Sequence, residues 1–158
     1  MRVRHIIHRP KTLASDTGWR QDDLQPRYAP HFSRTLPVRR HWKWRSLAAT
    51  DQNGQDYVLV VRINAMKGDW QSVLCRKMAE GEASVIGRFE YHEDHPGIHL
   101  HSHCDRSGVE NGATGLNGLG RFPGNNTFHR RKTAWTENSF LEASKRFFRI
   151  RERKGELL

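Results

Sequence analysis

Histidines are concentrated in one short segment of this chain, and their spacing there indicates chemistry. Five of the ten histidines lie between residues 92 and 103. Residues 98–104 alternate between histidine and other side chains, and in a β-strand every second side chain points to the same face. His99, His101 and His103 are therefore expected to share one face of a strand, with the even-numbered residues on the other.

The preceding residues 83–91 are expected to form the partner strand of a hairpin whose connection is residues 92–97. Pairing Tyr91 with Ile98 and Phe89 with Leu100 collects apolar side chains on one face, as a half-buried sheet requires. The remaining pairs on that apolar face and on the opposite face follow from this register. They are Val85 opposite Cys104, Glu90 beside His99, Arg88 beside His101, and Ile86 beside His103.

The second face therefore brings imidazoles, a carboxylate and a guanidinium together. Because histidine titrates near neutral pH, His99 and His101 can act as general base and general acid. Glu90 can orient His99 or raise its pKa, and Arg88 can stabilise charge on a phosphate. These four residues are the predicted catalytic groups of a metal-independent phosphodiesterase that cleaves RNA through its 2′-hydroxyl.

The same cluster also suits a divalent transition metal such as zinc. Alternate histidines on a strand supply two ligands, and a third comes from elsewhere. The candidate ligands are His95, His99, His101 and His103, and Glu90 is also available as the third ligand. Arg88 on the same face opposes a dication, which counts against this alternative. A third alternative is an exposed strand face that is histidine-rich without a ligand.

Two partial resemblances involve the same residues. The triplet His99-Leu100-His101 resembles the His-hydrophobic-His core of the HUH nucleases, which implies a metal-binding pair on a central antiparallel strand. Those enzymes also use a tyrosine nucleophile; no tyrosine follows Tyr91, so Tyr28 would have to serve. His99 and His101 also resemble the paired histidines of cupins, but the stretch that follows lacks the strands of a cupin barrel. Neither family mechanism is carried over.

The charge of the chain points to a polyanion. The 27 Lys and Arg outnumber the 17 Asp and Glu, giving a net charge of +10. Residues 1–45 alone hold eleven basic and three acidic side chains. Such asymmetry is typical of proteins that bind nucleic acid, and RNA is favoured over DNA here. Predicted phosphate contacts are Arg39, Arg40, Arg130, Arg131 and Lys132. The alternative partner is an acidic protein.

The expected fold is α+β, with an antiparallel sheet of four to five strands and a packed C-terminal helix. Residues 1–41, which contain four prolines, are expected to form a basic, mostly irregular extended arm or an irregular layer over the sheet. Residues 42–158 are expected to form a single domain with a Gly/Asn-rich loop at 105–127. Residues 69–79 fit a helix or a strand. The C-terminal helix is expected to be capped by Thr136 or Ser139 and to bury Phe140, Ser144, Phe147 and Phe148.

These observations predict a small basic nuclease, a toxin-like or defence-associated ribonuclease. An acidic antitoxin is the protein partner that such an enzyme would need. The alternatives are a non-catalytic nucleic-acid-binding protein with a histidine-bound structural metal and an interaction subunit that docks on an acidic partner. No run of about 18 apolar residues occurs, so no membrane is expected as partner. Two cysteines are too few for a disulfide framework, which favours the cytoplasm.

Overall fold

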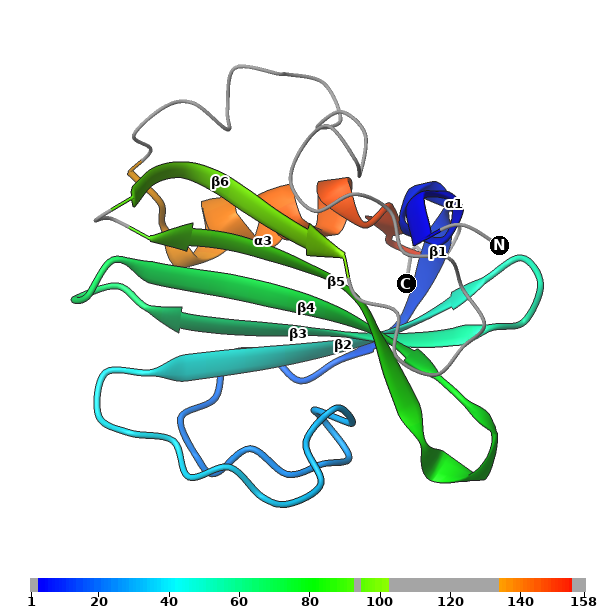
Figure 1. Cartoon of the computed structure of the whole chain (residues 1–158), viewed down its shortest axis with the longest axis horizontal. Helices are drawn as coiled ribbons and strands as arrows, with labels where there is room; N and C mark the ends of the chain where they lie inside the picture. Colours follow the sequence, from blue (N-terminus) through cyan, green and yellow to red (C-terminus); the bar gives the residue numbers. More distant parts are fainter. Residues whose placement is uncertain (1–2, 93–94, 103–133, 155–158) are drawn as a thin grey trace.

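The computed structural model describes residues 3–92, 95–102 and 134–154, and of residues 95–102 it describes the backbone (Figure 1). Its elements in chain order are α1 (Val3–His8), β1 (Lys11–Asp16), β2 (Lys43–Asp51), β3 (Asp56–Asn64), β4 (Asp69–Lys77), the single 3-10 turn η1 (Ala79–Gly81), β5 (Ala83–His92), β6 (His95–Ser102), α3 (Glu137–Phe147) and β7 (Ile150–Arg151). No helix in these ranges is long and apolar enough to cross a membrane.

The fold is α+β, as the sequence predicts, but its sheet is larger than expected. Seven strands follow the order β6-β5-β4-β3-β2-β1-β7. All neighbours from β6 to β1 pair antiparallel, whereas β7 pairs parallel with β1. The prediction of four to five antiparallel strands was therefore wrong in number, and the β1–β7 pair is an exception to its antiparallel character.

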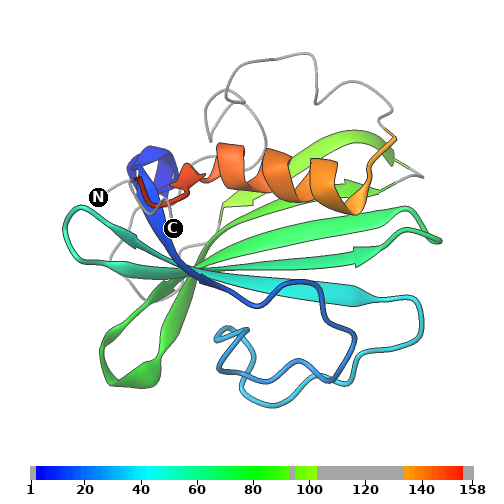
Figure 2. The same ribbon diagram turned by 180° about the vertical axis from the view of Figure 1, so that it is seen from behind.

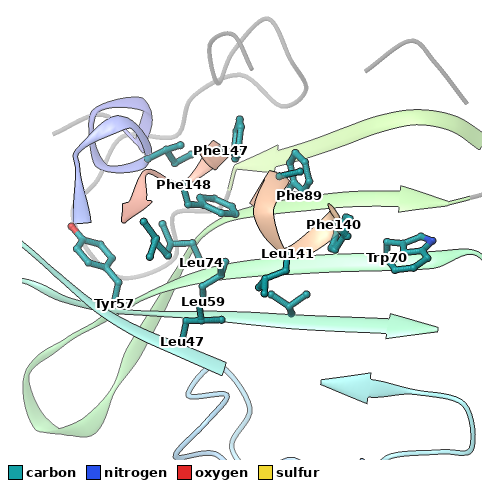
Figure 3. Packing of buried hydrophobic residues seen from close by; sticks show 14 of the residues in the cluster. Leu47, Tyr57, Leu59, Trp70, Leu74, Phe89, Phe140, Leu141, Phe147 and Phe148 are labelled. Carbon is teal, nitrogen blue, oxygen red and sulfur yellow. The ribbon is translucent and has the colours of Figure 1, made fainter. Parts of the chain in front are cut away.

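One face of the sheet packs against α3 and α1 (Figure 3). The aromatic side chains of α3 lie directly on β5, with the Phe89 ring centroid 5.7 Å from that of Phe140 and 5.3 Å from that of Phe147. Phe148 and Ser144 are also fully buried, so the predicted inner face of the C-terminal helix is confirmed. This layer fixes the position of β5 in the sheet.

The cap of α3 is formed by the first of the two predicted residues. The Thr136 hydroxyl accepts a hydrogen bond from the Ser139 backbone N–H at 3.0 Å, and the Thr136 N–H donates to the Ser139 hydroxyl at 2.8 Å. The capping box therefore starts at Thr136, and Ser139 is its third helical position. The alternative in which Ser139 caps the helix was wrong by one helical turn.

The opposite face of the sheet is covered by residues 17–42, seen in blue to cyan on the side away from α3 (Figures 1 and 2). Leu24 and Ala29 from this layer pack on Trp44, Val58 and Val60 of the sheet. Of the two interpretations of the N-terminal region, the irregular layer is therefore confirmed for these residues. Residues 1–41 are not one extended arm, because they also contain α1 and the strand β1.

Residues 69–77 form the strand β4, so the helical alternative was wrong. Trp70 and Leu74 belong to the core beneath α3, whereas Val73 and Cys75 are buried on the other side. Because both faces of this central strand are covered, the usual alternation of apolar and polar residues is lost. A strand buried on both sides then resembles a helical apolar pattern over a short window.

A β-bulge near the start of β5 changes the predicted faces. Leu74 pairs with Gly87 and Cys75 with Val85, so Ile86 is an extra residue between the two pairs. Ile86 is completely buried in the core beneath α3, whereas Val85 is half-buried. The assignment of Val85 to the apolar face and Ile86 to the histidine face was therefore wrong, although the faces of Phe89 and Tyr91 were assigned correctly.

Candidate functional site

The pairing of β5 with β6 places the predicted catalytic residues opposite one another along the backbone. Glu90 pairs with His99 and Arg88 with His101, in the predicted register. Tyr91 pairs with Ile98, but His92 then pairs with His95, so the connection is shorter than the six residues expected. Directly opposite residues of an antiparallel pair have Cβ atoms about 5 Å apart on the same face.

Glu90 is held in place by groups on three sides. Glu90 is only 8% exposed. One of its carboxylate oxygens, Oε2, lies 2.9 Å from Nε2 of His92. The other oxygen, Oε1, lies 3.3 Å from Nε of Arg88 and accepts a hydrogen bond from the Gln71 amide at 3.5 Å. A carboxylate tied to several donors has a fixed orientation and can in turn orient a neighbouring imidazole.

His92 joins two carboxylates from neighbouring strands. Its Nδ1 lies 3.0 Å from Oδ1 of Asp69 on β4, and its Nε2 bonds Glu90. Partial burial of the ring opposes its charged form, but the hydrogen bonds that the ring donates to Asp69 and Glu90, with the negative charge of both, outweigh this effect and raise the pKa of His92 above 6.5. When protonated, the ring donates from both nitrogens, so His92 acts as a clamp that fixes the orientation of Glu90.

This clamp predicts a pH dependence of stability. Because the pKa of His92 is higher in the folded protein than the 6.5 of an unfolded chain, its contribution to stability is fully present below pH 6.5. That contribution is lost as the pH rises through the folded-state pKa. The free energy of unfolding in urea is therefore expected to fall more steeply with rising pH for the wild type than for His92→Gln. A constant difference between the two proteins across this window would contradict the clamp.

Several predicted site residues lie outside the residues or side chains that the structure describes. The side chains of His95, His99 and His101 are outside the described atoms. His103, Cys104, Arg130, Arg131 and Lys132 are outside the described residues altogether. The predicted metal site therefore stays a prediction. Among the residues whose side chains the structure describes, no group of three His, Cys, Asp or Glu is placed to hold a metal ion.

A basic groove lies on the same side of the sheet as Glu90. It has a volume of about 300 Å³ and is lined by Leu36, Pro37, Val38, Arg39, Trp42, Lys43, Trp44, Arg62 and Lys67. Of the two predicted phosphate contacts in residues 1–41, Arg39 lines this groove. Arg40 is exposed but is not part of the lining. Four of the lining residues are cationic and none is acidic.

The groove and the Glu90 site are connected through one row of paired residues. Trp44 pairs with Arg62, Arg62 with Gln71, and Gln71 with Glu90. Since neighbouring strands are about 4.8 Å apart, Arg62 lies roughly 10 Å from Glu90 across the sheet. The face opposite α3 therefore carries a continuous polar track from the groove to β5.

His31 lies on this face as well, where it contacts the sheet. Its Nδ1 is 3.4 Å from Sγ of Cys75, and its ring contacts that of Phe32 at a tilt, with centroids 4.1 Å apart and an interplanar angle of 36°. Burial, reinforced by the charges of Arg62 and Arg88, lowers the pKa of His31 to about 4. His31 is therefore neutral at pH 7, and its contact with Cys75 attaches the covering layer to β4.

No known family, curated protein or solved structure matches the chain. The function is therefore inferred from the geometry of the residues themselves.

Sequence reasoning missed several residues of this face. Asp69, Arg62 and His92 join the site through cross-strand pairing that depends on β4 being a strand. Trp42 and Trp44 alternate in the sequence, and alternating aromatic residues in a strand favour core positions for both. Trp44 is 1% exposed and confirms that assignment, whereas Trp42 is half-buried and lines the groove. The position of Trp42 just before the first residue of β2 is the signal that separates the two tryptophans.

Proposed function

We propose that this protein is a small ribonuclease whose cleavage site lies where β5 pairs with β6. The observation that carries the proposal is the backbone register, which sets Glu90 opposite His99 and Arg88 opposite His101. Glu90 and Arg88 are themselves fixed by an ion pair on that strand. A charge of +10 and the basic groove supply the attraction for a polyanion.

The proposed reaction needs no cofactor. One imidazole of the pair His99 and His101 removes the proton of a 2′-hydroxyl, whose oxygen attacks the adjacent phosphorus. The other imidazole donates a proton to the departing 5′-oxygen, which leaves a cyclic phosphate and a free 5′-hydroxyl. Arg88 stabilises the negative charge that develops on the phosphoryl oxygens. DNA, which lacks the 2′-hydroxyl, is expected to be bound but not cleaved.

The test is cleavage of labelled RNA and DNA, each with and without a chelator. The wild type is expected to cleave RNA in the presence of the chelator, and His101→Ala to lose about 100-fold or more of that rate. His5→Ala, which removes an exposed histidine of α1, serves as the matched control and is expected to keep full activity. An unchanged rate in His101→Ala would reject this site, as would the absence of any cleavage by the wild type.

A second function is favoured by the groove. A non-catalytic nucleic-acid-binding protein would use the same cations, with His95, His99, His101 and His103 holding a structural zinc or similar metal. Metal analysis of the purified protein separates the two proposals, because the ribonuclease proposed here needs no bound metal. Stoichiometric metal with undiminished binding and no cleavage would support the second function.

The proposed setting follows from the reaction. A ribonuclease in the cytoplasm is harmful to its own cell, as expected of a toxin-like or defence-associated enzyme. An acidic protein, such as an antitoxin, would neutralise it by covering the basic face through charge complementarity. An interaction subunit without activity would bind the same partner, and the cleavage assay distinguishes it from the ribonuclease.

A further inference from the structure

Trp42 lies in the basic groove beside the cations Arg39, Arg62 and Lys67. Within the described part of the chain, no carboxylate forms an ion pair with Arg39, Arg62 or Lys67. Lys43 differs, because its Nζ lies 2.5 Å from a Glu137 carboxylate oxygen. Three uncompensated positive charges around one small groove favour an anionic ligand.

The aromatic part of the groove is organised by Arg62. Its guanidinium carbon lies 5.3 Å from the centre of the Trp42 ring and 5.8 Å from that of Phe32. Cation–π contacts of this kind hold an indole in a defined orientation. Trp44, in contrast, donates from its indole N–H to the Asp22 carbonyl at 2.6 Å and is buried. Trp42 is therefore the tryptophan that a ligand can reach.

We infer that this groove binds one unpaired nucleotide of single-stranded RNA, with its base stacked on Trp42 and its phosphates held by Arg39 and Lys67. A flat indole accepts any base, because every base presents a π-face. The bases of a duplex are stacked on one another, so a duplex cannot use this surface. The volume of about 300 Å³ is at the small end for ligand sites and suits a single nucleotide.

The groove also has the right position for a substrate subsite. Its Arg62 lies roughly 10 Å from Glu90 along the row through Gln71, on the same face of the sheet. An RNA strand anchored at Trp42 would therefore pass β3 and β4 along the half-buried Arg62 and Gln71, and would reach the β5–β6 pair with a nearby phosphate. The identity of the ligand as RNA rests on the proposed function, but the stacking and charge of the groove do not.

The test measures binding separately from cleavage. The probes are a short fluorescein-labelled 2′-O-methyl oligouridylate, which cannot react through its 2′-oxygen, and an abasic strand of equal length. Trp42→Ala is expected to weaken binding of the oligouridylate about 10-fold or more. Binding of the abasic strand is expected to change by less than about twofold, since stacking needs a base. Equal weakening of both probes, or of neither, would overturn the inference.

The charges are tested with a variant that does not touch the indole. Lys67→Gln replaces an exposed side chain and is expected to weaken the binding of both probes to the same extent. It should also reduce the slope of log affinity against log salt by about 0.7, the value for one phosphate contact on a single strand. Lys154→Gln, at an exposed lysine near the C-terminus, is the charge control, and Met66→Ala, 74% exposed, is the apolar control. An unchanged salt slope in Lys67→Gln would show that Lys67 does not contact a phosphate of the bound strand.

These results are independent of the cleavage assay. Loss of cleavage in His101→Ala with unchanged binding in Trp42→Ala would reject the nucleotide site in the groove but support the proposed ribonuclease activity. Base-dependent binding through Trp42 without any cleavage would reject the ribonuclease and leave the groove. If Trp42→Ala fails to fold, Trp42→Leu keeps apolar bulk beneath Arg62 but no flat ring, and the same loss is expected. A Trp42→Leu protein that binds both probes as the wild type does would overturn the inference.

Discussion

A Lys11→Met variant is expected to lose about 3 kcal/mol of the free energy of unfolding. The ammonium of Lys11 is almost completely buried and lies close to four backbone carbonyl oxygens. Nζ is 2.8 Å from the oxygen of Ile6, 3.2 Å from that of Ile7, 2.9 Å from that of Arg9 and 2.9 Å from that of Phe148. A cation at the C-terminal ends of α1 and α3 is also favoured by both helix dipoles.

Two effects oppose one another at Lys11, and their balance decides the sign. Burial lowers its pKa to about 7, against the attraction of Asp51, so the charged form is held at a cost. Replacing a buried charge by an apolar side chain stabilises a protein only when its partners are replaced too. Here the carbonyl oxygens stay in place and would lose a donor. We therefore expect a net loss of stability.

Urea unfolding of purified protein measures this loss. Lys154→Met is the matched control, because Lys154 is exposed, and a change within about 0.5 kcal/mol is expected for it. A Lys11→Met protein as stable as the control would mean that the desolvation of the ammonium outweighs its contacts with the carbonyls.

The β5–β6 hairpin shows what the sequence could predict. Alternation over residues 97–104 and the apolar residues at Phe89 and Tyr91 fix which side chains share a face, although a slip by two residues would keep the same faces. The predicted register, with Tyr91 opposite Ile98, is the one observed. The same rule fails at Ile86, because a β-bulge adds one residue and exchanges the faces. Periodicity counts residues and therefore carries no information about where a bulge occurs.

The strands β1 and β7 could not be predicted because their signals are nonlocal. β7 has two residues, too few for a periodic pattern, and it forms because Lys11 and Thr12 pair with Ile150 and Arg151. In β1 only Lys11 is buried, so the strand shows no apolar alternation. Its place in the sheet is set by pairing with β2. A strand whose position is set by its neighbours and not by its own side chains cannot be predicted from its local sequence.

The candidate site was predictable only along one strand pair. Glu90 and Arg88 follow from alternation within residues 83–91. Asp69 and Arg62 enter the same face through β4 and β3, and the order of strands cannot be read from one sequence. His92 was expected in a turn, but the strand continues through it, and this continuation places its ring between Asp69 and Glu90.

Removing the charge of Glu90 is expected to have the largest effect on cleavage. In Glu90→Gln, we expect the rate of RNA cleavage to fall on the order of 1000-fold, as when a carboxylate that orients a catalytic histidine is made neutral. Glu90 lies opposite His99 and is itself fixed by His92 and Arg88, so its proposed role is to position other groups. The measurement is the initial rate on labelled RNA as a function of pH.

Two further measurements distinguish the proposed positioning role of Glu90 from a role in stabilising the fold alone. The pKa of His92, followed by NMR, is expected to fall in Glu90→Gln because one of the carboxylates that raise it is gone. Asp69→Asn removes the other carboxylate of His92 without touching the β5–β6 pair, and it is expected to lower the His92 pKa while reducing cleavage less than about tenfold. If Asp69→Asn and Glu90→Gln reduced cleavage equally, the hydrogen bonds of His92, and not the position of Glu90 opposite His99, would limit the reaction.

Glu142→Gln, on the exposed side of α3, is the control for the loss of one carboxylate. It is expected to cleave RNA as the wild type does.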